Sequence, residues 1–231
     1  MELLLPYSSH HCWHCCCHIV VEISHPKLCS CCCKSCSYIG NHQKKDGSNE
    51  QPQLIYLQPP KEGWLKLNFD GGTYPNKEVP QEVNALRAGT FRNHKGICVY
   101  AFAGTIPMKS AKYAEASTLY RGLQIVAENE WPKIWAEGDA KFLIETILHN
   151  TQRDYCSTIW KLIGNTQRRR HNFEDCKITF IRRKCNFTID ALCKHIKRKY
   201  GNFKYNDKVL PCKIKNIVHQ ERQGCIYTYY T

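Results

Sequence analysis

The chain from residue 64 to 70 alternates between hydrophobic and polar residues, which is the period of a β-strand with one face toward a core. The two glycines that follow, residues 71–72, are expected to end this strand. A polar turn over 93–96 separates two more segments of strand character, 87–92 and 97–102. Together these segments predict a strand followed by a β-hairpin.

Helical periodicity begins further along the chain. Apolar residues recur every three or four positions between Ser110, a suitable N-cap, and about Glu130, and they predict a long helix with one buried face. Further helices are expected over 140–148, 157–170 and 187–199, and further strands over 134–137 and 177–183. Three strands followed by this alternation indicate an α/β fold, a mixed sheet covered by helices.

Composition divides the 231 residues into three regions. Residues 1–60 are a Cys/His-rich tract and a polar linker, 61–199 carry the predicted folded domain, and 200–231 are basic without a periodic pattern, which predicts a C-terminal tail. No apolar run approaches the roughly 18 residues of a membrane-spanning helix. Because Glu2 and Pro6 are untypical of a secretory signal, we expect an intracellular protein, nuclear or cytoplasmic. We also expect a monomer.

The net charge of +13 is concentrated toward the C-terminus. Residues 171–231 contain 13 basic and five acidic side chains, whereas residues 1–60 are balanced. This excess favours a polyanionic partner, most simply nucleic acid. A basic protein without such a partner is the alternative.

Nine of the 16 cysteines lie within the first 36 residues. Without a secretory signal we expect reduced thiols rather than a disulfide scaffold. Two Cys-x₂-Cys pairs, Cys12/Cys15 and Cys33/Cys36, suggest one tetrahedral Zn²⁺ site and an interaction protein that acts through this tract. The alternative is a segment that does not fold.

Four acidic residues stand at positions where chemistry is expected. Asp70 ends the first strand, and Glu115 lies on the apolar face of the long helix. Asp139 directly follows the strand at 134–137, and Asp190 lies near the start of the last helix. An acid on a buried face is costly unless it is paired or bound to a metal. For each acid taken alone, a helix cap or a surface carboxylate is the alternative.

If the fold brings the four acids together, their mutual repulsion requires cations. Carboxylate oxygens suit Mg²⁺ or Mn²⁺, and two such ions about 4 Å apart support in-line phosphoryl chemistry. The four acids therefore predict a two-metal site that acts on phosphodiesters.

Four segments around these acids resemble the ribonuclease H family, especially the plant retroelement-type domain associated with reverse transcriptases. They are Trp-Leu-Lys-Leu-Asn-Phe-Asp-Gly-Gly (64–72), Lys-Tyr-Ala-Glu-Ala-Ser-Thr-Leu-Tyr-Arg-Gly-Leu (112–123), Ala-Glu-Gly-Asp-Ala-Lys-Phe-Leu (136–143) and Arg-Lys-Cys-Asn-Phe-Thr-Ile-Asp-Ala-Leu-Cys-Lys (183–194). The resemblance covers about residues 61–197. It implies a five-stranded mixed sheet flanked by helices, and Mg²⁺-dependent cleavage of the RNA strand of an RNA–DNA hybrid.

The resemblance also implies a role for each acid. Asp70 would bridge two metal ions, Glu115 and Asp139 would complete the shell of one, and Asp190 would hold the other. One ion would activate water, and the other would stabilise the leaving 3′ oxygen. Glu115 and the backbone of residues 71–72 would lie near the ribose, whose 2′-OH distinguishes RNA from DNA.

Nucleic-acid contacts are expected from basic and small residues around the acids. The predicted contacts are Gly71, Gly72, Arg182, Arg183, Lys184, Asn186 and Lys194. Basic side chains bind phosphates without sequence choice, and this binding weakens steeply with salt. For the further basic run at 168–170, a solvated helix end is an equal alternative.

The sequence departs from the family pattern at residues 88–92 and at Phe180, Lys184 and Ile189. Residues 88–92 are one residue shorter than the family's second strand, and a one-residue slip exchanges the faces of a strand, so a distorted hairpin is expected. Phe180 stands where some ribonucleases H have a histidine, and Lys184 stands where an acid is common. These departures favour a second hypothesis, a catalytically eroded nucleic-acid-binding protein derived from a retroelement.

Overall fold

The computed structural model describes residues 53–73, 85–106, 110–197, 199, 201–223 and 226–229. The chain divides into two compact units, Met1–Glu50 and Gln51–Thr231, and every described residue belongs to the second. The Cys/His tract with its predicted zinc site therefore lies outside the described residues.

The described residues form strands and helices in an alternating order. In chain order they are β1 (Gln53–Tyr56), β2 (Leu65–Thr73), β3 (Ala85–Arg92), β4 (Cys98–Ile106), α1 (Ala111–Glu128), β5 (Lys133–Gly138), α2 (Lys141–His149), α3 (Ser157–Arg170), β6 (Asp175–Phe180), the 3₁₀ turn η2 (Arg183–Cys185), α4 (Phe187–Ile196), β7 (Asn202–Tyr205), α5 (Cys212–Arg222) and β8 (Ile226–Tyr229). The predicted hairpin and long helix are confirmed, and Ser110 caps α1 by accepting a hydrogen bond from the Tyr113 amide. No helix in this part of the chain is long and apolar enough to cross a membrane.

The main sheet is mixed and has six strands in the order β6-β5-β2-β3-β4-β7. β2, β5 and β6 run parallel to one another, whereas β3, β4 and β7 are joined by antiparallel pairing. The five-stranded prediction is corrected by β7, an edge strand that residues 202–205 add beside β4. β1 and β8 form a separate antiparallel pair.

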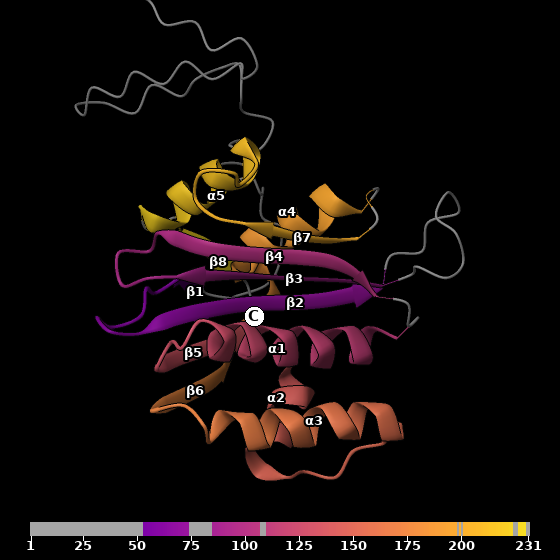
Figure 1. Cartoon of the computed structure of the whole chain (residues 1–231). Coiled ribbons are helices and arrows are strands. Elements are labelled where there is room, and N and C mark those ends of the chain that lie inside the picture. Colours follow the sequence, from indigo (N-terminus) through magenta and orange to yellow (C-terminus); the bar gives the residue numbers. More distant parts are fainter. Residues whose placement is uncertain are drawn as a thin grey trace, which may run out of the picture. The chain divides into compact units, whose positions relative to one another are not determined.

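Helices cover both faces of the sheet (Figure 1). α1, α2 and α3 lie on one side, and α4 and α5 lie on the other. The larger core cluster joins α1 and its neighbours to the sheet, and the second joins α4 and α5 to β3 and β4. Because other elements pack on both sides of the sheet, both faces of β2 are buried, and the polar face that carries Lys66 and Asn68 is as inaccessible to solvent as the hydrophobic one.

Gly122 lets α1 approach the sheet closely. A Cβ added there would overlap the side chain of Leu67 on β2. The distance between α1 and β2 at this point leaves room for the hydrogen atom of a glycine but not for the methyl group of an alanine.

Several predicted boundaries are wrong. β2 continues through Gly71 and Gly72 to Thr73, since both glycines pair with β3. β6 ends at Phe180, so residues 182–184 lie in a turn before α4 and not along a strand. β3 pairs with β2 over all eight of its residues, and the irregularity expected in this hairpin is confined to residues 91–92 on the β4 side.

The C-terminal residues, expected to form a tail, contain β7, α5 and β8. Leu210, Ile214 and Val218 are buried in the second core cluster, against residues of α4. This hydrophobic contact makes α5 part of the folded unit.

Candidate active site

Asp70 lies near the end of β2, on the face covered by α4. Its side chain is buried, and burial, followed by the charge of Asp139, raises the pKa of this carboxyl to about 6. Arg183 and a hydrogen bond from the Gly71 backbone amide lower the pKa of Asp70, and the charge of Asp190 raises it. Asp70 is therefore surrounded by the other charged groups of the predicted site.

Glu115 reaches Asp70 from the second turn of α1. A Cβ added to Gly71 would lie 2.5 Å from the Glu115 backbone nitrogen, so only a glycine permits this crossing of β2 and α1. Burial, together with the charges of Asp139 and Asp70, raises the pKa of Glu115 to about 7. Strand and helix thus hold two carboxylates within electrostatic reach of each other.

Asp139 is brought to the same place by the parallel pairing of β5 with β2. Phe69 pairs with Gly138, so the residues that follow them, Asp70 and Asp139, emerge side by side. Burial raises the pKa of Asp139, while Arg183, whose Nε lies 3.9 Å from Oδ2, lowers it. The Oδ1 atom of Asp139 is buried and has no hydrogen-bond partner.

Asp190 completes the group from the first turn of α4. Its charge raises the pKa of both Asp70 and Asp139. Lys194, one turn further along the helix, forms an ion pair with Asp190 at 2.5 Å. Four elements far apart in sequence therefore bring each of the predicted acids within electrostatic reach of Asp70.

The donor set fits a hard divalent cation. All four groups offer carboxylate oxygens, which Mg²⁺ and Mn²⁺ prefer, and the buried Oδ1 of Asp139 has no other partner. Among the residues that the structure describes, no three His, Cys, Asp or Glu side chains stand close enough to share one metal ion. Repulsion between ionised carboxylates opposes closer approach until a cation offsets it.

The predicted nucleic-acid contacts lie in different environments. Arg183 and Lys194 expose 80% and 65% of their side chains, as a phosphate contact requires. Gly71 and Asn186 are buried in this structure. The Asn186 amide donates to the Phe69 carbonyl oxygen at 2.9 Å, so it ties α4 to β2 beside Asp70.

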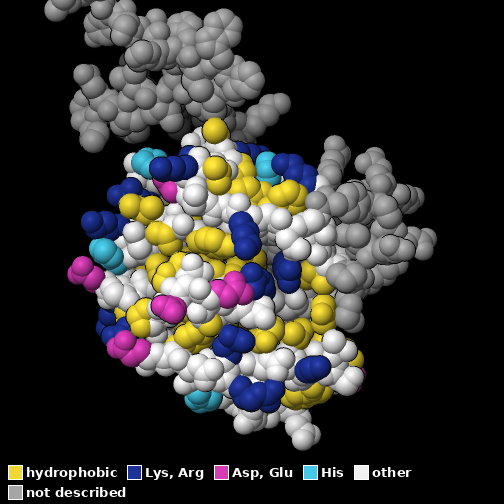
Figure 2. All heavy atoms as spheres, viewed as in Figure 1, with side chains coloured by type: hydrophobic (Ala, Val, Ile, Leu, Met, Phe, Trp, Pro, Cys, Tyr) yellow, Lys and Arg dark blue, Asp and Glu magenta, His cyan; other side chains and the backbone are white. Residues whose placement is uncertain are grey.

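The remaining predicted contacts give a mixed picture. Gly72 and Arg182 are half-buried, and Lys184 lies in the η2 turn. Lys and Arg side chains are spread over the face of the molecule in Figure 2 and do not form one continuous patch. The cysteines of the described residues, from Cys98 to Cys212, form no disulfide with one another.

A buried polar network on the face of β2 that carries Asp70 was not predicted from the sequence. Lys66 pairs with Glu137 at 2.7 Å, and Asn68 links Glu137 to Arg92, with hydrogen bonds of 3.4 and 2.7 Å. Arg92 in turn pairs with Glu221 of α5 at 2.5 Å. The available signal was the polar face of β2, which must be buried once helices cover both sides of the sheet.

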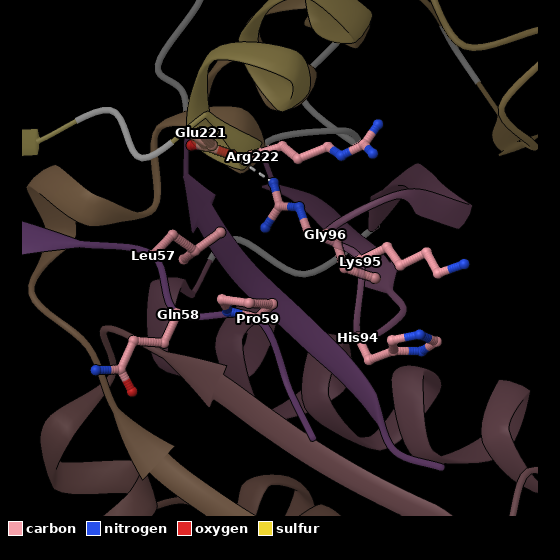
Figure 3. Close-up of a pocket in the computed structure, with 9 residues that line it drawn as sticks. Leu57, Gln58, Pro59, His94, Lys95, Gly96, Glu221 and Arg222 are labelled. Carbon is pink, nitrogen blue, oxygen red and sulfur yellow. Dashed lines mark hydrogen bonds and ion pairs between the residues drawn. The ribbon is translucent and has the colours of Figure 1, made fainter. Parts of the chain in front are cut away.

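A cavity of about 110 Å³ lies at the opposite end of β2 from Asp70 (Figure 3). It is formed by residues 57–59, the turn of the β3–β4 hairpin and the end of α5. None of the four acids lines it, so it is separate from the candidate active site.

Comparison with solved structures identifies the class of fold. The RNase H1 of the halophilic archaeon Halobacterium salinarum superposes with a TM-score of 0.50 at 20% identity, over 56% of this chain and 94% of that protein. The N-terminal RNase H domain of a Mycobacterium tuberculosis protein gives 0.49 at 14% identity, over 68% and 96%. An RNase H1 isolated from compost, solved in complex with an RNA/DNA hybrid, gives 0.47 at 14% identity, over 55% and 92%.

The chain therefore has the α/β fold of the ribonuclease H-like proteins. The family model described as "Reverse transcriptase-like" matches residues 68–196, more than half of the sequence, and the chain belongs to this family. The search of curated proteins returned no match.

Proposed function

We propose that this protein is an endoribonuclease that hydrolyses the RNA strand of RNA–DNA hybrids with the support of two divalent cations, Mg²⁺ or Mn²⁺. The observation that carries this proposal is the convergence of Asp70, Glu115, Asp139 and Asp190. The pKa values of the first three are raised, and the charge of Asp190 contributes to the rise at Asp70 and Asp139. Such perturbed, clustered carboxylates are typical of functional sites.

The four carboxylates would hold the cations. Asp70 would be the central ligand, because the charges of both Asp139 and Asp190 act on its pKa. When bound, the ions would supply an activated water and stabilise the leaving 3′ oxygen. The protein contributes a rigid, largely buried frame: the Gly71 crossing fixes Glu115, and the register of β2 and β5 fixes Asp139 beside Asp70. Arg183 and Lys194 would attract the phosphates of the substrate.

The choice of an RNA–DNA hybrid rests on family membership and on the site. A related RNase H1 was solved with an RNA/DNA hybrid. Half-exposed Gly72 lies two residues from Asp70 and offers backbone groups that a ribose 2′-OH could contact. The Reverse transcriptase-like family is consistent with origin from a retroelement, such as those of plants.

The decisive experiment measures Mg²⁺-dependent cleavage of three substrates: RNA–DNA hybrid, double-stranded RNA and double-stranded DNA. The full chain should cut only the RNA of the hybrid, and Asp70→Asn should abolish cutting. Asp154→Asn is the control, since Asp154 is exposed in a loop and should leave the rate unchanged. Absence of cutting by the wild type under Mg²⁺ and Mn²⁺ alike would contradict the proposal.

A second candidate function is nucleic-acid binding without cleavage. The Asp190–Lys194 pair and the approach of Arg183 to Asp139 favour it, because these cations partly neutralise the carboxylates without a metal. Hybrid binding that is equal with and without Mg²⁺, with no cleavage product, would support this candidate.

A further inference from the structure

The first turn of α4 is capped by a residue from outside that helix. Its own N-cap, Asn186, makes no side-chain capping bond, because its amide is directed to the Phe69 carbonyl oxygen. The first amides of a helix need acceptors, and a buried one left without a partner is costly. Glu221 supplies the acceptor: its Oε1 lies 3.3 Å from the Thr188 amide nitrogen.

Glu221 belongs to α5, beyond the residues matched by the family model. Its carboxylate also accepts a 2.5 Å hydrogen bond from the Thr188 hydroxyl. Because a helix N-terminus carries partial positive charge, a carboxylate at this place is favoured more than a neutral acceptor. Thr188 precedes Asp190 by two residues, so the contact fixes the turn that carries Asp190.

Arg92 holds Glu221 in this position. The two side chains expose 3% and 2% of their surface and form an ion pair. Arg92 is fixed in turn by its bond to Asn68, which stands two residues before Asp70 on the same face of β2. One chain of buried contacts therefore leads from β2 through Arg92 and Glu221 to α4.

We infer that Glu221 is a positioning residue for the carboxylate site: it clamps the first turn of α4 so that Asp190 is held opposite Asp70. The inference rests on the proposed function, since it assigns Asp190 to cation binding. It makes α5, outside the family-matched segment, a required part of the site.

The test compares Glu221→Ala and Glu221→Gln with Lys213→Ala, an exposed position on the same helix. Hydrogen exchange is measured on the full chain, and Mn²⁺ affinity is measured by calorimetry. In the Glu221 variants, amides 188–191 should exchange faster by about tenfold while α1 stays protected. Mn²⁺ should bind about tenfold more weakly, the usual effect of losing a group that orients a metal ligand. Lys213→Ala should match the wild type.

Glu221→Ala leaves Arg92 buried without its partner and is the variant most at risk of unfolding. The double variant Arg92→Leu/Glu221→Leu removes both buried charges and also lacks the carboxylate that caps α4. It should therefore show the same faster exchange of amides 188–191. Wild-type exchange in α4 together with wild-type Mn²⁺ affinity would overturn the inference. Equal loss of protection in α1 and α4 would also overturn it, because the role would then be general stability. A wild type that binds no Mn²⁺ would contradict the proposed function. Hydrogen exchange would still test whether Glu221 holds the first turn of α4.

Discussion

Gly71 of β2 lies so close to Glu115 of α1 that a Cβ on the glycine would come within 2.5 Å of the glutamate's backbone nitrogen. The atoms that it would meet belong to the helix backbone, which cannot move aside as a flexible side chain can. The approach of these two residues sets the separation between the Asp70 and Glu115 carboxylates.

Gly71→Ala should therefore destabilise the fold by about 2 kcal/mol or more, because overpacking forces the backbone to shift. Cleavage should fall even where the variant is folded, since Glu115 moves away from Asp70. Gly164→Ala is the matched control: its Cβ would meet only Arg168 at 3.7 Å, and alanine is favoured inside a helix by about 0.5–1 kcal/mol. Urea unfolding measures the stability of both variants, and a cleavage assay on the folded protein measures their activity. An unchanged midpoint for Gly71→Ala would show that the crossing is not tight.

The metal-free protein should lose stability as pH rises. Asp70 and Glu115 have pKa values of about 6 and 7, above their ordinary values, so the folded state binds more protons than the unfolded chain between about pH 4 and 7. The free energy of unfolding should fall through this window, by about 3 kcal/mol for each of the two carboxyls and about 6 kcal/mol in total. Urea unfolding in EDTA between pH 4.5 and 8 measures the slope.

Saturating Mg²⁺ should reduce this slope, because a bound cation favours the ionised carboxylates. Asp70→Asn should also reduce it, and should raise stability at pH 8 while abolishing cleavage. A metal-free stability that rises with pH over the same range would contradict the assigned environment of these two acids.

Arg183→Ala should weaken hybrid binding and lower the slope of log affinity against log salt by about one, since one phosphate contact is lost. Arg183 also lowers the pKa of Asp70, Glu115 and Asp139, so its removal should move the acid limb of the pH–rate profile to higher pH. Lys213→Ala, on the exposed face of α5, provides the control. Equal salt slopes for wild type and Arg183→Ala would remove Arg183 from the interface.

Phe180→His should increase the cleavage rate. Phe180 ends β6 opposite Gly138, the residue before Asp139, and is 45% exposed, so an imidazole there is accessible to solvent and substrate. A positioned histidine that transfers protons contributes about 10²–10⁴-fold in favourable cases, and we expect at least tenfold here. Single-turnover cleavage measures the change. Phe142→His, at another exposed phenylalanine, should give no increase, and an equal gain in both variants would rule out a positional effect.

The periodicity of the sequence determined most of the secondary structure. Alternation predicted β2 and the hairpin, and the three-to-four residue spacing predicted α1 with its Ser110 cap, because these patterns reflect local geometry. The four acids were recognisable as a group from their places at strand ends and on a helix face that must be buried. The end of β2 was misplaced because glycines often stop a strand, whereas here Gly71 and Gly72 pair with β3 and admit α1.

What only the tertiary structure decided concerns the second face of the sheet. A lone strand pattern cannot show whether Lys66 and Asn68 face water or a second helical layer, and their burial became visible only when α4 and α5 covered that face. The same holds for Glu221, which is an ordinary charged residue near the end of a short helix until the fold places it between Arg92 and Thr188. Local patterns determine helices and strands because they depend on neighbours in sequence. The buried charge of Arg92 finds its partner Glu221 129 residues away, and only the packing of the whole domain specifies such a pair.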